Sequence, residues 1–362
     1  MILISLLIFL MFSQQALALP LERLTLPPGY QISIAAKVEN ARQMTLGEPG
    51  ILFVGSRREG KVYRLRDSDH DGIFEQKETL MRRLNMPTGV AYRNGDLYVA
   101  AVNRILMVRG AEQVSDLPIR GHLVTDDLPD INHHGWKYLK FGLDGQLYFN
   151  LGAPCNTCLS DDPRFASILS LNLKTNRQKI IAHGVRNSVG FTWHPENNEF
   201  WFTDNGRDHL GDDQPDDELN RLTATGQHFG YPYIHAGNIA DPEFYQGQNY
   251  ADYQPPQLRL GAHVAPLGLT FYNGSTFPDT SADHLFIAEH GSWNRSSKVG
   301  YRIVRVNTAR SPVQQEVFIS GWLQGENAWG RPVDVIVDRD GSLLISDDKA
   351  DVIYRVSYRG TN

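Results

Sequence analysis

The sequence predicts an all-β fold, a six-bladed β-propeller, on three observations. A turn containing Gly, Asn or Asp, followed by a strand of alternating apolar and small residues, occurs six times. Most copies are flanked by further strand-like segments and follow one another at about 45 to 60 residues, which is typical of propeller blades. The chain of 362 residues carries 32 glycines and 19 prolines without a long helical pattern, as expected of a turn-rich β protein.

The six repeats can be followed in order along the chain. The first three are "EPGILFVGS" with "KVYRL", "TGVAYR" with "NGDLYVAA" and "RILMV", and "LKFGL" with "DGQLYFNL" and "SILSLNL". The last three are "VGFTWHP" with "NNEFWFTD", "LGLTFY" with "ADHLFIAE" and "YRIVRV", and "VDVIVD" with "DGSLLISD" and "VIYRV". The interval after the fourth repeat is longer because the stretch from "QPDDELNRL" to "DYQPPQLRL" inserts a loop.

One further strand, "YQISIAAKV" at residues 30–38, lies outside the six repeats. We expect it to complete the last blade, so that the ring closes and no sheet edge stays open. The alternative, a β-sandwich with an accessory domain, does not produce six repeats of similar length.

The chain begins with "MILISLLIFLMFSQQALALP", an apolar run that ends in the small-residue pattern of a cleavage site after Ala18. Residues 1–18 are therefore predicted to be a signal peptide, and residues 19–362 a single propeller domain exported to the periplasm. No other run approaches the roughly 20 apolar residues of a membrane span. The net charge of −6 argues against nucleic acid as a partner.

The two cysteines lie together in "GAPCNTC", as Cys155 and Cys158. In an exported protein this spacing favours a small disulfide ring, because a zinc site needs two more soft or imidazole ligands. The next residue is Leu159 rather than His, which excludes covalent haem attachment.

Polar residues recur at comparable points of different blades, where propeller loops form a ligand site at one end of the channel. They are His134, Arg186 and Asn187 in "VRNSVG", the turn "TDNGRDHLGDD", "EHGSWNR", and Arg331 in "WGRPVD". Each has an ordinary structural explanation on its own. Together they favour a site for a polyanionic ligand.

The segments "HHGWKYLKFGLDGQLYFNLGAPCN", "GVRNSVGFTWHP", "FTDNGRDHLGDDQPDDELN", "HGSWNR" and "GRPVDVIVDRDGSLLISDD" resemble the pyrroloquinoline-quinone (PQQ)-dependent glucose/sorbosone dehydrogenases, which are six-bladed propellers. The resemblance covers nearly the whole mature chain. It implies oxidation of an aldose or related sugar, with PQQ and Ca²⁺ as cofactors and a separate electron acceptor as partner. No GxGxxG follows a strand and opens a helix, so a nicotinamide cofactor is not expected.

The resemblance also implies roles for individual residues. It makes His134 the general base and brings Arg186 and Asn187 to the quinone. The backbone carbonyls of Gly206 and Arg207 would bind Ca²⁺, and Arg331 would bind a cofactor carboxylate.

The chain departs from the family pattern at several positions. Ser188 and Val189 stand in place of Pro and Gln, and Val333 in place of a second arginine. The cofactor lysine has Arg295 or Lys298 as its possible substitute.

Two other functions remain open. Six-bladed lactonases and esterases also bind Ca²⁺ in the channel, but through side-chain carboxylate and Asn ligands rather than carbonyls. A non-catalytic ligand-binding propeller is the other alternative, and it would not need His134 beside an arginine cluster.

A second Ca²⁺ site is predicted in "DSDHDGIFEQKE", which fits the pattern D-x-D-x-D-G with Glu at the twelfth position. Its expected ligands are Asp67, Asp69, Asp71, the carbonyl of Ile73 and Glu78. The flanks are strands, so we expect a β-hairpin loop rather than an EF-hand, with a solvated turn as the equal alternative.

The adjacent His133 and His134 raise a question of register. Neighbouring residues of an extended chain point to opposite sides. We therefore expect His134 to face the channel and His133 to face the adjoining loop.

Overall fold

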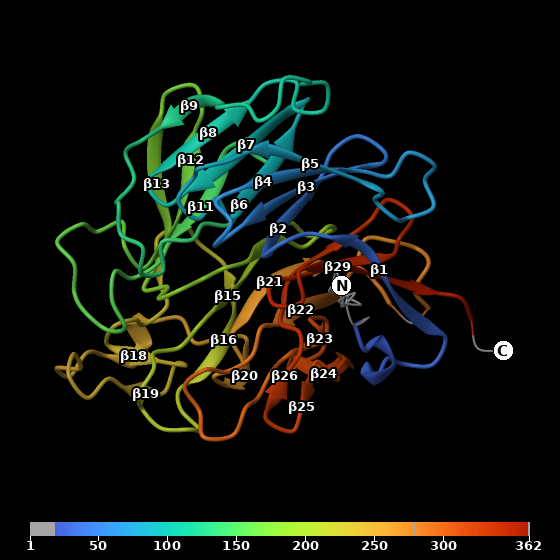
Figure 1. The fold of residues 1–362 in the computed structure, drawn as a ribbon. Coiled ribbons are helices and arrows are strands. Elements are labelled where there is room, and N and C mark those ends of the chain that lie inside the picture. The colour runs from blue at the N-terminus through green and yellow to red at the C-terminus, as the bar shows by residue number, and fades with distance from the viewer. Residues whose placement is uncertain (1–18, 279, 361–362) are drawn as a thin grey trace, which may run out of the picture.

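The computed structural model describes residues 19–278 and 280–360, and shows sheets that follow one another around a centre (Figure 1). Six sheets of at least four strands account for most of the structure. Their innermost strands contact one another from blade to blade. The predicted six-bladed β-propeller is therefore confirmed. The predicted signal peptide, 1–18, lies outside the described residues.

Each blade contains four antiparallel strands, which are given below in order from the channel outward. The first three blades are β2 (Ala41–Leu46), β3 (Ile51–Ser56), β4 (Val62–Arg66) and β5 (Gln76–Met81); β6 (Gly89–Arg93), β7 (Asp96–Ala101), β8 (Arg104–Val108) and β9 (His122–Thr125); and β10 (Leu139–Phe141), β11 (Leu147–Leu151), β12 (Ser167–Asn172) and β13 (Arg177–His183). The last three are β14 (Phe191–Trp193), β15 (Phe200–Asp204), β16 (Asp216–Leu222) and β20 (Leu258–Ala262); β21 (Pro266–Phe271), β22 (His284–Glu289), β23 (Arg302–Asn307) and β24 (Gln314–Ile319); and β27 (Pro332–Val337), β28 (Leu343–Asp347), β29 (Val352–Tyr358) and β1 (Tyr30–Lys37).

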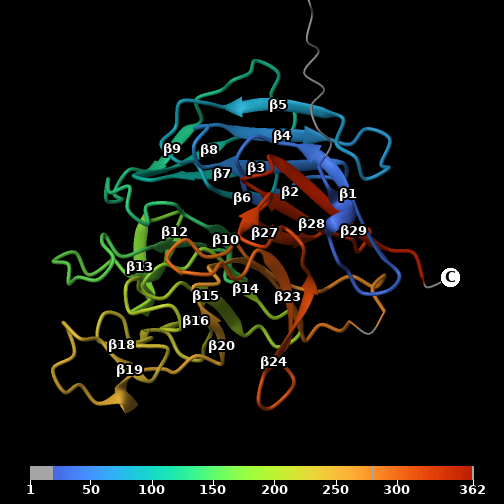
Figure 2. The same ribbon diagram turned by 60° about the horizontal axis from the view of Figure 1, so that its bottom comes forward.

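The ring closes between the two ends of the described chain. Strand β1 pairs antiparallel with β29, with Tyr30 opposite Tyr358 and Lys37 opposite Val352. The two strands lie side by side in both views (Figure 1, Figure 2). The prediction that the early strand completes the last blade is confirmed.

Apart from β1, the outermost strands were not anticipated from the sequence, which showed only the inner strands of each repeat. Strands β5, β9 and β24 are exposed over much of their length and carry many polar residues. An edge strand needs no continuous apolar face, so its alternation is weak.

The long fourth interval forms an insertion between β16 and β20. It contains β17 (Gln227–His228), β18 (Ile234–His235), β19 (Ile239–Ala240) and the 3-10 helix η2 (Tyr250–Asp252). The insertion projects to one side of the ring (Figure 2), although β17 pairs parallel with β13 of the third blade. The remaining short elements are η1 (Leu21–Arg23), β25 (Leu323–Gln324) and β26 (Asn327–Ala328).

The apolar core lies between neighbouring blades, where side chains of adjacent sheets pack together. Trp201 and Trp322 are among its largest fully buried side chains. In the part of the chain that the structure describes, no helix is long or apolar enough to cross a bilayer.

Candidate active site

A cavity of about 550 Å³ occupies the end of the channel where the innermost strands begin. This volume lies within the range of small-molecule sites. Its lining includes five of the residues singled out from the sequence, His134, Arg186, Asn187, Gly206 and Arg331. The fold therefore brings together residues that are far apart in the chain.

His134 is held in a conformation in which one ring nitrogen has no hydrogen-bond partner among the described residues. It is buried, and its Nδ1 lies 2.9 Å from the carbonyl oxygen of Ala153. A carbonyl only accepts, so Nδ1 carries the proton and Nε2 keeps its lone pair. Burial, followed by the positive charge of Arg186 and then the neighbouring His133, lowers the pKa of His134 well below 6.5. The imidazole is therefore neutral at neutral pH and can accept a proton.

His133 and His134 do not point to opposite sides, and that expectation was wrong. Their ring centroids are 4.1 Å apart, and both residues line the cavity. The reason is the backbone, because His134 has a φ of 47° and the segment is a turn rather than extended chain. Gly152 permits this packing, since a Cβ there would come within 2.6 Å of the His134 Cβ.

Arg186 is a buried cation with a complete set of protein acceptors. Its Nε and Nη2 donate to the carbonyl and the side-chain oxygen of Asn156, at 2.9 and 2.8 Å. Its Nη1 donates to the carbonyls of Asn205 and Gly206, and Nη2 also donates to Asp208. All five guanidinium N–H groups are thus used. Arg186 offers a bound ligand its fixed charge rather than a free N–H.

The Ca²⁺ ligands expected at Gly206 and Arg207 do not fit a metal in this arrangement. The Gly206 carbonyl accepts a 2.7 Å hydrogen bond from Arg186, so a divalent cation there would lie beside a buried guanidinium. Arg207 does not line the cavity, and its side chain pairs with Asp241 and Glu243 in the insertion. We derive no chemical step through Ca²⁺ at this position.

Arg331 lies at the cavity wall with donors to spare. Its Nε and Nη2 donate to the carbonyls of His290 and Gly291, at 3.1 and 2.6 Å, and its guanidinium stacks on Tyr301. Burial lowers the pKa of Arg331 below its usual value. Among the described residues, only these two carbonyls accept hydrogen bonds from the Arg331 guanidinium. Its other N–H groups are therefore available to a ligand.

Arg295, expected as a cofactor ligand, does not line the cavity. Its Nη2 donates to Asp213 at 2.6 Å, and its Nη1 donates to the carbonyl of Ser297. The other possible substitute, Lys298, is held by Glu326. Lys298 does not line the cavity either.

Arg42, Arg57 and His290 also line the cavity. His290 belongs to the segment "EHGSWNR" singled out from the sequence, whereas Arg42 and Arg57 were missed. Asp348 joins two of them, with Arg42 at 2.9 Å and His290 at 2.8 Å. Burial opposes its charge, but His290, Arg42 and Arg331 hold the pKa of Asp348 well below its usual range. Arg57, His290 and Asp348 each directly follow the second strand of a blade, so one positional rule would have found them.

Leu267 and Trp136 line the cavity and form its apolar floor. Beneath the floor, Leu267 belongs to a buried cluster with Val189 and Val333, against which Trp136 packs. Two of these residues are the departures from the family pattern, where polar side chains were expected. The site therefore combines an apolar floor of Leu267 and Trp136 with four arginines, Arg42, Arg57, Arg186 and Arg331, at its walls.

Cys155 and Cys158 form a disulfide, as predicted. The ring packs on Tyr231, whose hydroxyl accepts from the Cys158 N–H at 3.0 Å. A disulfide is consistent with export.

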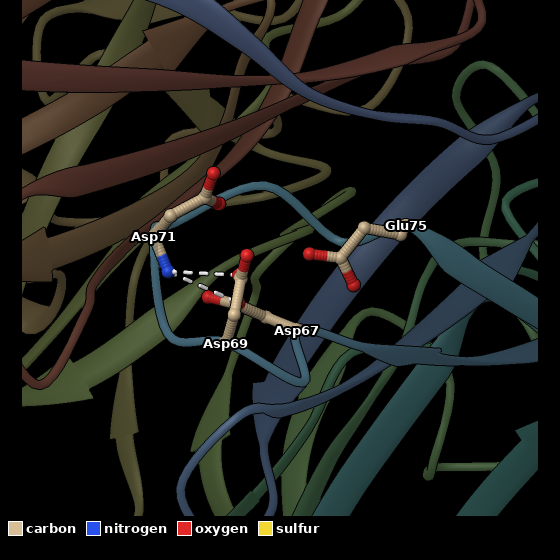
Figure 3. Close-up of side chains that lie close together, drawn as sticks. All are labelled: Asp67, Asp69, Asp71 and Glu75. Atoms are coloured by element: carbon tan, nitrogen blue, oxygen red, sulfur yellow. Dashed lines mark hydrogen bonds between the residues drawn. The ribbon is translucent and has the colours of Figure 1, made fainter.

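The acidic loop before β5 gathers four carboxylates (Figure 3). Oxygens of Asp67, Asp69, Asp71 and Glu75 all lie within 4.8 Å of one another. Glu78 is not part of this group, which corrects the expected ligand set. It lies in β5 opposite Arg64 and pairs with Arg64 and Arg66 at 2.7 and 3.2 Å.

The loop is already shaped by its own hydrogen bonds. The Asp67 carboxylate accepts from the N–H groups of Asp71 and Gly72, and Asp71 accepts from the Ile73 N–H. Ca²⁺ binding, with the Ile73 carbonyl as a ligand, stays a prediction, with Glu75 taking the place of Glu78.

Comparison with known proteins gives the family. A profile described as "Domain of unknown function (DUF7133)" matches residues 18–356. The chain belongs to this family. Another protein, described as uncharacterized, from Borreliella burgdorferi is 37% identical to this DUF7133 chain over 352 residues, which is 92% of the chain and 91% of that protein.

Several solved structures share the fold of the DUF7133 chain. A Trichoderma reesei protein of carbohydrate-active enzyme family AA12 is 20% identical, with 92% of this chain and 97% of that one covered, and a TM-score of 0.77. The PQQ domain of pyranose dehydrogenase from Coprinopsis cinerea is 15% identical, over 92% and 97%, with a TM-score of 0.74. The soluble aldose sugar dehydrogenase of Escherichia coli is 16% identical, over 91% and 100%, with a TM-score of 0.65. Two of these three proteins are described as sugar dehydrogenases, and at these identities all three show the fold alone.

Proposed function

We propose that the chain is a PQQ-dependent oxidoreductase that oxidises an aldose or a related sugar or aldehyde. The observation that carries the proposal is the pairing of an apolar floor with arginine walls. A planar aromatic polycarboxylate such as PQQ presents an apolar face to the floor and anionic edges to the walls. The PQQ domain of pyranose dehydrogenase, one of the structural neighbours, supports this choice of ligand.

The arginines around the cavity can bind an anionic ligand in two ways, by hydrogen bonds and by charge. Arg331 has free N–H groups and can donate to a carboxylate, whereas Arg186 contributes a fixed positive charge. Arg42 is neutralised in part by Asp348, so Arg57 is the remaining cation on the first blade. When bound, PQQ supplies the electron-poor quinone that accepts hydride from the sugar.

His134 is assigned the role of general base. Its Nε2 lone pair is free, because Nδ1 donates to Ala153. A base must take the proton from the sugar hydroxyl as hydride leaves the adjacent carbon. His134 and the arginines line the same cavity, so the proton acceptor and the anion site are adjacent.

The proposal includes the cellular compartment and the electron acceptor of the enzyme. We take residues 19–362 as the mature domain, exported to the periplasm after removal of a signal peptide. There the two electrons would pass to a separate acceptor. Ca²⁺ is proposed only for the acidic loop of Asp67, Asp69, Asp71 and Glu75.

The test begins with binding of PQQ to the purified full chain, measured by quenching of tryptophan fluorescence. The second step is reduction of a dye by the PQQ-loaded protein in the presence of a panel of aldoses. Saturable PQQ binding with sugar-dependent dye reduction supports the proposal. Absence of PQQ binding, or hydrolysis of lactones without added PQQ, would overturn it.

A further inference from the structure

The disulfide ring contacts Arg186, at the cavity wall, through Asn156. This residue lies between Cys155 and Cys158, inside the loop that the disulfide closes. Its carbonyl and its side-chain oxygen both accept from Arg186, at 2.9 and 2.8 Å. One residue thus supplies two of the five acceptors of the guanidinium.

Asn156 also connects Arg186 to the fourth blade. Its side-chain oxygen accepts from the Asp208 N–H at 2.9 Å, and its amide donates to the Asp208 carbonyl at 3.2 Å. The Asp208 carboxylate pairs with Arg186 at 3.1 Å. The guanidinium is therefore held between the ring of the third blade and the turn that follows β15.

The ring itself is fixed from outside. Tyr231, in the insertion, accepts from the Cys158 N–H, and its hydroxyl lies 3.6 Å from the Cys155 sulfur. A loop of this length without a cross-link samples many conformations, and closing it removes most of them. The disulfide therefore limits where the two acceptor oxygens of Asn156 can lie.

We propose that the Cys155–Cys158 ring, acting through Asn156, is a positioning element that fixes the charge of Arg186 at the cavity wall. Without the ring or the Asn156 acceptors, the guanidinium keeps only its contacts to Asn205, Gly206 and Asp208, and its position is less restricted. The expected consequence is weaker binding of an anionic ligand. The choice of PQQ as the ligand rests on the proposed function, whereas the positioning of Arg186 does not.

The experiment compares full-length variants by two measurements. Asn156→Ala removes the side-chain acceptor, and Cys155→Ser with Cys158→Ser opens the ring. Asn156→Asp keeps both acceptor oxygens. Thr157→Val is the matched control, because Thr157 lies in the same ring and its hydroxyl has no hydrogen-bond partner among the described residues.

The first measurement is the dissociation constant for PQQ by fluorescence. We expect a rise of about 10-fold for Asn156→Ala and for the double cysteine variant, as loss of a charge-assisted contact predicts. Thr157→Val should leave the dissociation constant unchanged. Asn156→Asp should raise it, because the carboxylate lacks the amide donor to the Asp208 carbonyl and offsets the positive charge of Arg186.

The second measurement is the titration of His134 by NMR without PQQ. Displacement of Arg186 removes a positive charge that lowers the pKa of His134, so the midpoint should rise in Asn156→Ala and stay unchanged in Thr157→Val. Wild-type binding and titration in Asn156→Ala and in the double cysteine variant would overturn the inference. If the wild type does not bind PQQ, the proposed function fails, and the His134 titration still decides the positioning of Arg186.

Discussion

The guanidinium of Arg57 lies over the indole of Trp136, 4.4 Å from the ring centroid. Trp136 in turn donates its Nε1–H to the side-chain oxygen of Asn187 at 3.1 Å. Residues from the first, third and fourth blades thus meet at the edge of the apolar floor. Burial, and next the neighbouring Arg42, lower the pKa of Arg57 to about 10, which leaves it charged at neutral pH.

Arg57→Ala should weaken PQQ binding about 10- to 100-fold, because it removes a cation that the apolar floor cannot replace. Arg57→Lys should give a smaller loss, since it keeps the charge but not the flat stacking on Trp136. Fluorescence titration measures both. Arg58→Ala is the control, because Arg58 is exposed and does not line the cavity. Equal losses for Arg57→Ala and Arg58→Ala would show that only net charge matters.

His134→Ala should lower kcat by about 10²- to 10⁴-fold after saturation with PQQ, the usual effect of losing a general base. His133→Ala should have a milder effect. The two variants test the assignment strictly, because the rings of His133 and His134 are 4.1 Å apart in the same cavity, and a general loss of packing would affect both. A near-wild-type kcat for His134→Ala, or a collapse confined to His133→Ala, would reject the assignment.

The pH dependence follows from the low pKa of His134. As pH falls through 6.5, an ordinary imidazole gains a proton, but burial and Arg186 keep His134 neutral. The acid limb of kcat/KM should therefore lie below pH 6.5, and Arg186→Gln should move it upward. The unfolded chain protonates this residue first, so its contribution to stability also decreases as pH falls from 6.5 toward the folded-state pKa. An acid limb at or above pH 6.5 in the wild type would contradict the prediction.

Ca²⁺ should raise the melting temperature of the wild type through the acidic loop. A ligand present at 100 times its Kd stabilises the folded state by about 2.7 kcal/mol. Asp69→Asn with Asp71→Asn should abolish the shift, whereas Glu78→Gln should keep it, because Glu78 pairs with Arg64 instead. Thermal unfolding with Ca²⁺ and with a chelator measures the effect. A shift that survives the double Asp variant would place the ion elsewhere.

Tyr30→Ala should destabilise the closure of the ring. Tyr30 begins β1 and packs edge-on against Phe277, Phe318 and Tyr358. The free energy of unfolding should fall by about 1 to 3 kcal/mol, as for loss of a half-buried aromatic ring. Urea unfolding measures it, with the exposed Gln31→Ala as control. Similar values for the two variants would mean that this contact is not needed for closure.

The sequence by itself determined the blade number, the closing strand and the disulfide. Inner strands such as β3 and β15 are buried on both faces, so their apolar residues mark every repeat. Polar edge strands such as β5 leave no such mark, because solvent accepts almost any side chain there.

Only the tertiary structure decided how the site is assembled. Arg57 and Asp348 each follow the second strand of a blade, but only the closed ring pairs Asp348 with His290 and brings Arg57 and His290 to one cavity. The turn at His134, with its φ of 47°, placed both imidazoles in one cavity, since its backbone depends on packing against Gly152. Likewise, cross-strand pairing with Arg64 removed Glu78 from the acidic loop and left Glu75 there. Periodic burial can be detected in a sequence, but contacts between distant segments depend on how the chain closes on itself.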